Sequence, residues 1–415
     1  MPNIPALLNA ILLATILCIS ESCAAQVTTG LDNIITEHWT PLKDKNVGLI
    51  TNQTGRTRKG EFGYSLFALQ KSFKLVALYS PEHGLRGERS AGVASDTIER
   101  FMGVPVYSLY GSTRKPTKTM LRGVTALVFD IQDIGVRPYT YLSSMVLSME
   151  AAAQNGIPFF VLDRPNPLSG ERIEGNILDT ALKSFVGQVP VPYLHGMTLG
   201  ELATMAKAKG WFNKAAQLQL TVIPLQGWKR TMYWNETGLP WIAPSPNIPT
   251  FESAAGAAML GATGELGIVS IGIGSDAPFL HIGSTLLGTS QILRTVDSSM
   301  PKELLLTAED FTGSSNAGVK NYHGVRITLP PKLSTVCSLY EGQYRMLELM
   351  LHDTAFRSSF DQIAYSSQNM FAKVTGMHGL FDMLKRCEDL DPVFERWRKD
   401  AEMFRRDREP YLLYH

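Results

Sequence analysis

The stretch Leu75-Val76-Ala77-Leu78-Tyr79-Ser80-Pro81-Glu82-His83-Gly84-Leu85-Arg86-Gly87 decides the fold of this chain, because it joins an apolar run to a polar loop. Residues 75–79 have the length and composition of a buried strand. In α/β enzymes the loops after parallel strands hold the reactive side chains. We therefore expect Glu82 and His83 at a strand end, with Arg86 beside them as a fixed cation and two glycines that let the backbone turn tightly.

Similar apolar runs recur along the first half of the chain, at intervals close to those of a βαβ unit. They occupy residues 47–50, 104–107, 126–129, 159–162 and, more weakly, 222–225. Helix-like segments separate several of them, at residues 64–73, 141–155 and 198–209. The last segment begins with a capping-box pair, Thr198 and Glu201. This pattern predicts an α/β fold with a mostly parallel, doubly wound sheet.

The proline-rich stretch 240–249 suits neither a helix nor a central strand, so we place a domain boundary near residue 250. Beyond it, strand-like runs at 267–273 and 324–329 precede amphipathic helices at 340–352 and 391–408. The second part is therefore expected to be a smaller α+β domain.

Composition and motifs exclude several classes of function. The chain has 415 residues and a formal net charge of +1 at pH 7, without the basic stripe of a nucleic-acid-binding protein. Residues 272–277 fit the glycine spacing of a dinucleotide site, but Pro278 stands where the helix that meets the pyrophosphate must begin. We therefore expect no nucleic acid partner and no cofactor. Since no cysteine and histidine spacing is typical of zinc, we also expect no metal site.

The first 25 residues resemble a secretory signal peptide, with an apolar run at 6–17 and small residues up to Ala25. This run is shorter than the roughly 20 residues of a membrane-spanning helix. We therefore expect a periplasmic or secreted protein without a transmembrane helix in its mature chain, and lipid anchoring through Cys23 stays an alternative. The mature chain then keeps Cys337 and Cys387, either paired or as separate buried thiols; the oligomeric state is left open.

Polar side chains follow the predicted strands at the point where each strand ends. Carboxyl ends of parallel strands meet at one edge of a sheet, so these side chains are expected to share a crevice. They are Asn52 after the first run, Glu82 and His83 after the second, Asp130, Gln132 and Asp133 after 126–129, and Asp163, Arg164 and Asn166 after 159–162.

Several of these residues have a structural alternative. Asp133 can pair with Arg137 and cap the following helix, and Asp163 can pair with Arg164. His195 opens a helix, where it can meet an anion or serve only as a buried histidine. Glu174, beside Gly175, can approach a ligand closely. Glu82 and Glu174 together supply the carboxyl pair that hydrolysis of a glycosidic bond requires.

Seven motifs in this order resemble those of a known family, the NamZ-type exo-β-N-acetylmuramidases, of which the chain looks like a divergent member. The motifs are GLITNQTG at 48–55, SPEHGLRG at 80–87, DIQDIGVRPYTY at 130–141, DRPNPLSG at 163–170, HGMTLGELA at 195–203, PSPNIP at 244–249 and YLLY at 411–414.

The resemblance implies a Rossmann-like catalytic domain over 26–250 and a smaller α+β domain over 251–415 that closes an active-site cleft. It implies release of terminal N-acetylmuramic acid from the non-reducing ends of peptidoglycan fragments, muropeptides or disaccharides, in cell-wall recycling, without a cofactor. Glu82 is carried over as catalytic, in the role of the acid, and Glu174 as a second carboxylate. The residues assigned to substrate binding are Asn52, His83, Arg86, Asp130, Gln132, Asp133, Arg137, Tyr139, Asp163, Arg164, Asn166, His195 and Asn247.

One motif departs from the family pattern. Family members carry a stretch like E-G-T-N-x-S-x-G-R-G-T, whereas residues 265–275 read ELGIVSIGIGS, with Ile268 and Ile273 and without that asparagine and arginine. An arginine is a natural bidentate partner for a sugar carboxylate. A sugar-binding protein with weakened catalysis, or a different hydrolase such as an amidase or esterase, therefore remain alternatives.

Overall fold

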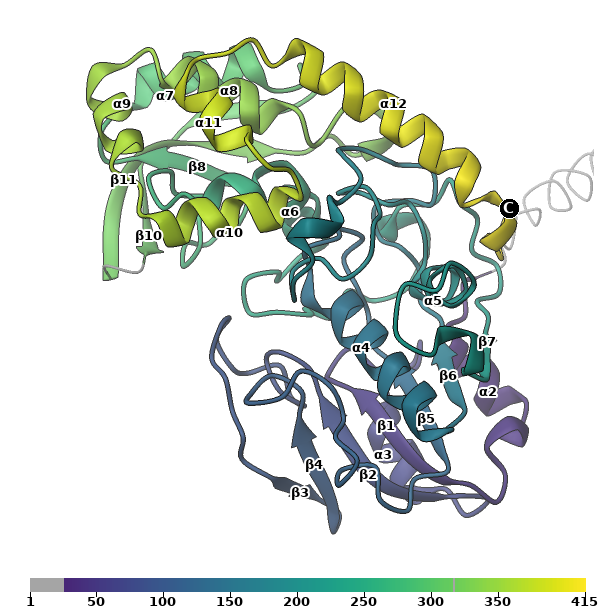
Figure 1. The fold of residues 1–415 in the computed structure, drawn as a ribbon. Coiled ribbons are helices and arrows are strands. Elements are labelled where there is room, and N and C mark those ends of the chain that lie inside the picture. Colours follow the sequence, from purple (N-terminus) through teal and green to yellow (C-terminus); the bar gives the residue numbers. More distant parts are fainter. Residues whose placement is uncertain (1–25, 316–317) are drawn as a thin grey trace, which may run out of the picture.

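The computed structural model describes residues 26–315 and 318–415, and the predicted signal peptide at 1–25, with Cys23, lies outside the described residues. A seven-stranded sheet organises the first half, in the order β3-β4-β2-β1-β5-β6-β7 (Figure 1). All pairs in it are parallel except β3 with β4. The strands are β1 (Asn46–Thr51), β2 (Lys74–Ser80), β3 (Glu99–Phe101), β4 (Val104–Ser108), β5 (Ala126–Asp130), β6 (Phe159–Leu162) and β7 (Leu220–Ile223).

The mostly parallel α/β prediction is therefore confirmed, with two differences in detail. β7 begins two residues before the predicted run. The short strand β3, Glu99-Arg100-Phe101, escapes prediction because its exposed residues form no apolar run. It pairs with β4 at the edge of the sheet, where a strand needs little apolar character.

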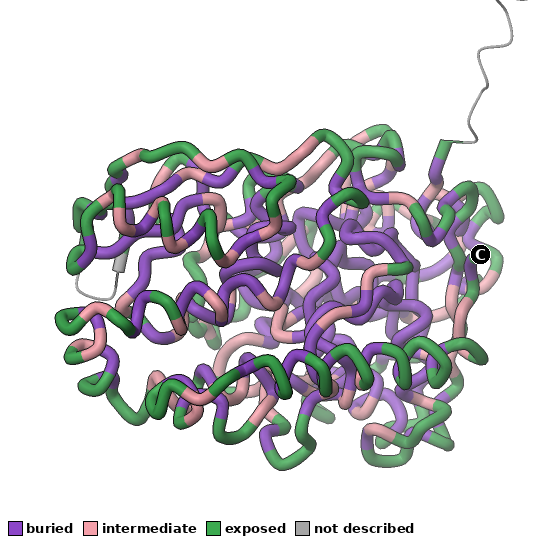
Figure 2. The backbone as a smooth tube through the Cα atoms, turned by 90° about the horizontal axis from the view of Figure 1, so that it is seen from above, coloured by how far each residue is buried: buried purple, intermediate pink, exposed green. Residues whose placement is uncertain are grey.

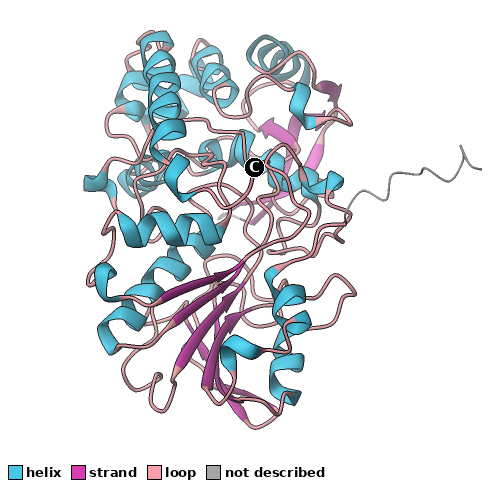
Figure 3. Ribbon diagram, turned by 90° about the vertical axis from the view of Figure 1, so that its right-hand side faces the viewer, coloured by secondary structure: helices cyan, strands magenta, loops and turns pink. Residues whose placement is uncertain are grey.

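Helices cover both faces of this sheet, as the edge-on view in Figure 3 shows. Neighbouring residues of a strand point to opposite faces, so Leu49 packs in the core under α2 (Gly30–Thr36) and α3 (Gly63–Leu69). Ile50 packs in the other core, under α4 (Thr140–Asn155) and α5 (Leu199–Ala208). Figure 2 shows buried backbone segments running through the interior, with exposed segments around the outside.

The second half contains a small antiparallel sheet and a group of helices (Figure 1). Its strands are β8 (His281–Ser284), β9 (Leu305–Ala308), β10 (Phe311–Ser315) and β11 (Gly318–Thr328). Its helices are α6 (Phe251–Gly264), α7 (Thr289–Ser299), α8 (Gly342–Met350), α9 (Thr354–Asp361), α10 (Tyr365–Thr375), α11 (Leu380–Lys385) and α12 (Asp391–Asp407). The α+β prediction is confirmed, and α8 and α12 match two predicted helices closely.

The strand predicted at 267–273 is wrong. Gly267, Gly272 and Gly274 adopt left-handed backbone angles, with φ of 72°, 78° and 80°, which turn the chain away from an extended course. Only Ser270 forms a β-bridge there, to Gly283.

The two remaining thiols also differ from both expectations, because Cys337 and Cys387 are unpaired and exposed.

The proline-rich stretch before Thr250, the N-cap of α6, contains no helix or strand. From the far side of the second half, α12 runs back across the molecule and brings the C-terminus beside α5 and β7 (Figure 1). Within residues 26–315 and 318–415, no helix has both the length and the apolar character needed to cross a membrane.

Candidate active site

Glu82 lies just beyond the end of β2, with 8% of its surface exposed. Its Oε1 accepts a hydrogen bond from the backbone N–H of Gly92 at 2.8 Å, and its Oε2 accepts one from Thr140 Oγ1 at 2.8 Å. Thr140 is the first residue of α4, so the carboxyl group lies at the positive end of a 16-residue helix. These two donors fix the orientation of the carboxyl group at the strand end.

The loop after Glu82 holds the imidazole of His83 in a defined state. His83 and Gly84 both have left-handed backbone angles, with φ of 70° and 77°. For a residue with a Cβ this conformation costs about 1–2 kcal/mol. His83 Nδ1 lies 2.8 Å from the carbonyl oxygen of Arg89, and a carbonyl can only accept. Nδ1 therefore donates, and Nε2 is the nitrogen that can accept a proton. Arg86, on the same loop, is exposed.

Hydrogen bonds join the ends of β1 and β5 to each other, and a close packing contact joins them to this loop. Thr54 Oγ1 donates to Asn52 Oδ1 at 2.6 Å and accepts from the backbone N–H of Gln132 at 2.9 Å. The side chain of Gln53 packs against Gly87 so closely that an added Cβ would lie 2.2 Å from the Gln53 amide group. The ends of three neighbouring strands, β2, β1 and β5, therefore meet in one site, as the sequence predicted.

Several buried polar atoms at these strand ends have no hydrogen-bond partner among the described residues. They include Gln53 Oε1, Asp130 Oδ2, Gln132 Oε1 and Asp133 Oδ1. A buried polar atom without a partner costs about 1–3 kcal/mol, and most buried polar groups in proteins are paired. Several such atoms in one place are typical of a site whose polar groups bind a ligand.

Asp133 is the second carboxyl group of this site. Its Oδ2 accepts from the backbone N–H of Gly135 at 2.8 Å, and burial raises its pKa to about 7. It lines a hollow of about 200 Å³ together with Arg164 and Asn166.

Both carboxyl groups act electrostatically on Tyr139. Burial raises the pKa of Tyr139 well above its usual value, and the negative charges of Asp133 and Glu82 both add to this shift. Tyr141, whose ring centroid lies 4.7 Å from that of Tyr139, responds to the same two carboxyl groups. The charges of Asp133 and Glu82 therefore act on the same pair of tyrosine hydroxyls.

A larger hollow of about 330 Å³ lies over the ends of β1, β5 and β6. Three guanidinium groups line it, those of Arg56, Arg58 and Arg164, and its lining contains no carboxylate. Arg164 is held by a 2.6 Å ion pair between its Nε and Asp130 Oδ1, rather than by the neighbouring Asp163. The remaining lining residues are Thr29, Thr54, Thr57, Gln132, Trp234, Leu239, Pro240 and Ile242.

Asp163 lies at the end of β6, but its carboxylate is already satisfied. It accepts from Thr198 Oγ1, the N–H of Gly200, the N–H of Arg164 and the hydroxyl of Tyr414. These contacts indicate a structural role, because a ligand would have to displace one of these donors.

Arg137 is fully buried and donates to four backbone carbonyls. They belong to Asn176, Val191, Val374 and Thr375, the last two at the end of α10. The sequence allowed an ion pair between Asp133 and Arg137, but all four of these acceptors are backbone carbonyls and none is Asp133. The Arg137 side chain joins the two halves of the chain instead of reaching the hollows.

Glu174 likewise has an occupied carboxylate. Arg172 donates to its Oε1 at 2.5 Å, and Oε2 accepts from Ser338 Oγ and from the N–H groups of Leu339 and Tyr340. As a second catalytic carboxylate it would have to exchange these donors for substrate or water.

His195, Asn166 and Asn247 are held in different ways. His195 Nδ1 accepts from the N–H of Met197, and burial, reinforced by the charges of Arg408 and Arg137, lowers the pKa of His195 to about 3. Asn166 Nδ2 donates to the carbonyl of Met197, and its Oδ1 accepts from the N–H of Leu168. Asn247 is half-buried in the proline-rich stretch, where its N–H donates to Ser245 Oγ.

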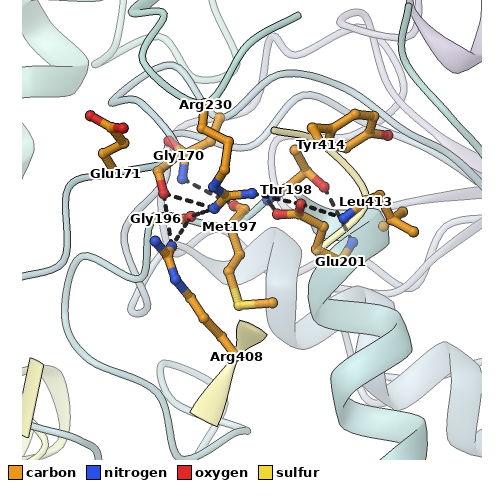
Figure 4. A network of polar contacts seen from close by, with 12 residues as sticks. Gly170, Glu171, Gly196, Met197, Thr198, Glu201, Arg230, Arg408, Leu413 and Tyr414 are labelled. Carbon is orange, nitrogen blue, oxygen red and sulfur yellow. Dashed lines mark hydrogen bonds and ion pairs between the residues drawn. The ribbon is translucent and has the colours of Figure 1, made fainter. Parts of the chain in front are cut away.

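A buried ionic network supports the loops after β6 (Figure 4). Arg230 pairs with Glu201 Oε1 at 2.7 Å and donates to the carbonyls of Gly170 and Gly196. Arg408, beyond α12, donates to the same two carbonyls. No sequence pattern pointed to Arg230 or Arg408, which lie outside every motif. The pair Arg56 and Arg58, soon after the first strand, was a signal that the sequence analysis missed.

The fold and the site define a class of protein: an α/β protein with two buried carboxyl groups at the strand ends of a doubly wound sheet, the kind of groups that hydrolysis of a glycosidic bond uses. The chain belongs to the exo-beta-N-acetylmuramidase NamZ family. The N-terminal model of that family matches residues 47–252, and its C-terminal model matches residues 255–414.

Relatives of known structure or activity match nearly the whole chain. It is 37% identical over 398 residues to the peptidoglycan beta-N-acetylmuramidase NamZ of Bacillus subtilis (strain 168), which covers 94% of this chain and 92% of that protein. It is also similar to two crystal structures of DUF1343 family proteins from Bacteroides fragilis NCTC 9343. One has a TM-score of 0.86 at 35% identity and the other 0.69 at 29%, and each match covers 94% of this chain and 99% of the other.

Proposed function

We propose that this protein releases terminal N-acetylmuramic acid from the non-reducing ends of peptidoglycan fragments, muropeptides or disaccharides. The observation that carries the proposal is that Glu82 and Asp133, two buried carboxyl groups in different settings, follow β2 and β5 at the same end of the sheet, where both charges act on Tyr139 and Tyr141. The 37% identity to the Bacillus subtilis enzyme supports the substrate class.

The two carboxyl groups have settings that suit different roles. Asp133, whose burial raises its pKa to about 7, keeps a proton near neutral pH and is suited to protonate the leaving oxygen. Glu82 accepts two hydrogen bonds and is suited to act as a carboxylate, either by attacking the anomeric carbon or by taking a proton from the attacking water. This reverses the acid role that the sequence suggested for Glu82. The net reaction breaks the bond between anomeric carbon and leaving oxygen and adds one water.

The arginine-lined hollow supports an acidic sugar as the substrate. N-acetylmuramic acid carries a lactyl carboxylate, and guanidinium groups bind carboxylates with two parallel hydrogen bonds. Arg56, Arg58 and Arg164 supply such groups at the strand ends. They offer a partner for the carboxylate in a chain that lacks the arginine of the usual family motif at 265–275.

Export and a place in cell-wall recycling belong to the same proposal. The apolar run at 6–17, followed by small residues up to Ala25, supports a signal peptide and hence a periplasmic or secreted enzyme, with lipid attachment at Cys23 as the alternative. Peptidoglycan fragments are accessible to an enzyme in those compartments. Mass spectrometry of the protein from membrane and soluble fractions tests this, because cleavage after Ala25 and lipidation of Cys23 give different N-terminal peptides.

The activity is tested with 4-nitrophenyl N-acetylmuraminide and the variant Glu82→Gln. We expect the wild-type protein to release nitrophenol and the variant to lose about 10²–10⁴-fold in rate. Glu88→Gln, an exposed glutamate on the same loop, is the matched control and should keep full activity. If the wild-type protein binds the muramide tightly but releases nothing, the protein is a sugar-binding member of the family rather than an enzyme.

A further inference from the structure

Three potential metal ligands meet in the second half of the chain, outside both hollows of the candidate active site. Asp276 lies in the loop before β8, His281 is the first residue of β8, and Glu309 lies between β9 and β10. One ligand atom from each residue lies within 4.8 Å of the other two. Three carboxylate and imidazole groups at such distances are close to the spacing of the ligands around one metal ion.

The hydrogen bonds of Ser275 fix the tautomer of His281. Ser275 Oγ lies 2.8 Å from the carbonyl oxygen of Gly272 and 2.9 Å from His281 Nδ1. A carbonyl can only accept, so the single hydroxyl proton of Ser275 goes to Gly272. His281 Nδ1 must then donate to Ser275 Oγ, which leaves the lone pair on Nε2. A donor bond from one ring nitrogen to a protein oxygen is the usual support of a metal-binding histidine.

The Nε2 atom of His281 is buried and has no hydrogen-bond partner among the described residues. It lies 3.6 Å from Glu309 Oε2, so a lone pair faces a carboxylate oxygen. The ring is fully buried and stacks on Phe311 at a centroid distance of 4.4 Å, which holds it in this direction. Two acceptors in this arrangement repel each other unless a cation or a proton lies between them.

Arg326 contacts one oxygen of each carboxylate. Its guanidinium donates to Asp276 Oδ2 at 2.9 Å and lies 3.5 Å from Glu309 Oε1. The other oxygens, Asp276 Oδ1 and Glu309 Oε2, are the ones nearest the imidazole, at 4.0 Å from Nδ1 and 3.6 Å from Nε2. Two carboxylates and one guanidinium leave a net negative charge that a divalent cation would neutralise.

We infer that Asp276, His281 and Glu309 form a binding site for a divalent transition metal ion, with zinc as the best fit. One imidazole and two carboxylates suit Zn²⁺, which takes such ligands at about 2.0–2.2 Å and completes a tetrahedron with water. Calcium and magnesium prefer oxygen ligands alone. The bound ion would cross-link the glycine-rich loop before β8 to the turn between β9 and β10. The sequence spacing of these ligands matches no common zinc motif, which explains why the sequence predicted no metal site.

Zinc binding by the EDTA-treated full chain tests the inference, measured by isothermal titration calorimetry and by the thermal midpoint. We expect one zinc per chain, a higher midpoint with zinc, and Co²⁺ absorption bands typical of a tetrahedral site. Asp276→Asn and Glu309→Gln, both at least partly exposed, should each weaken zinc binding about tenfold or more while the folded spectrum is unchanged.

Asp310→Asn and His323→Gln are the matched controls, because these residues form an exposed 2.9 Å pair on the same small sheet. They should bind zinc as the wild-type protein does. Absence of stoichiometric zinc binding in the wild-type protein would overturn the inference and leave a proton as the bridge between His281 and Glu309. Equal affinity in Asp276→Asn, Glu309→Gln and wild type would overturn it as well.

Discussion

The hydroxyl of Tyr414 donates to Oδ2 of Asp163 at 2.6 Å, although 251 positions separate the two residues. The same hydroxyl accepts from the N–H of Leu225 at 3.0 Å. Asp163 is fully buried and forms no ion pair with any described residue, so neutral donors satisfy its carboxylate. The last residues of the chain therefore complete the end of β6 beside the candidate active site.

Replacing Tyr414 with phenylalanine should lower the free energy of unfolding by about 1–3 kcal/mol, because a buried carboxylate loses a donor. The pKa of Asp163, which burial raises to about 6, should rise further without this hydrogen bond. Urea denaturation at pH 7 measures the loss. Tyr411→Phe is the control, since Tyr411 is half-buried and its loss of a hydroxyl should stay within about 0.5 kcal/mol. Equal midpoints for the two variants would contradict the structural role of Tyr414.

Replacing His195 with glutamine should make the free energy of unfolding less dependent on pH below about pH 6.5. The folded pKa of His195 is about 3, because the ring is buried, whereas an unfolded histidine titrates near 6.5. Between these values the unfolded chain binds a proton that the folded chain does not, so the free energy of unfolding falls as the pH drops from about 6.5 toward 3.

This contribution approaches about 1.4 kcal/mol per pH unit and disappears in His195→Gln. Urea midpoints at several values between pH 7 and pH 4 measure the slope. The control His378→Gln removes an exposed histidine and should keep the wild-type slope. The assignment fails if both variants have the same pH dependence.

Replacing Asp133 with asparagine should slow the hydrolysis of substrates with poor leaving groups much more than that of substrates with good leaving groups. A disaccharide needs a proton on its leaving oxygen, so its hydrolysis should slow by about 10²–10⁴-fold. A 4-nitrophenyl glycoside leaves readily without a proton and should lose much less. In Glu82→Gln, by contrast, the hydrolysis rates of both substrates should fall together, because that carboxylate acts on the sugar and not on the leaving group.

In the wild-type protein, we expect the rate of disaccharide hydrolysis to fall above about pH 7, because burial raises the pKa of Asp133 to about 7. The variant Asp133→Asn should lose this alkaline limb of the pH–rate profile. Initial rates with both substrates, measured from pH 5 to pH 9, provide the comparison. Equal losses on both substrates would contradict the acid role of Asp133 and return that role to Glu82 or to Glu174.

Replacing Arg58 with glutamine should raise KM for N-acetylmuraminides by about tenfold, because one guanidinium in the hollow no longer meets the lactyl carboxylate. The KM for the matching N-acetylglucosaminide, which lacks that carboxylate, should stay the same. Lys59→Gln is the control, since this neighbouring lysine is exposed and absent from the lining of the hollow. An unchanged KM for the muraminide would show that the acid group binds elsewhere.

Apolar runs and the polar residues after them were enough to predict the parallel sheet and the strand ends that meet at Glu82, Asn52 and Gln132. The sequence could not show which polar side chains have an atom free to bind a ligand and which already have all their hydrogen-bond partners within the protein. Asp163 lies in a motif as conspicuous as that of Asp133, and Glu174 lies beside a glycine. Some of the donors that satisfy these two carboxylates, however, come from positions more than 160 residues further along the chain. Such partners depend on tertiary packing, which local patterns do not encode.

The four carbonyls around Arg137 bear on how the protein is made. Thr375, the last of them in sequence, is synthesised 238 positions after the arginine. At about 5–20 residues per second, the guanidinium remains without its full set of acceptors for roughly ten to fifty seconds of translation. Until then only Asn176 and Val191 can accept from this guanidinium, and the nascent chain depends on water, or on a chaperone, to solvate the rest of the charge.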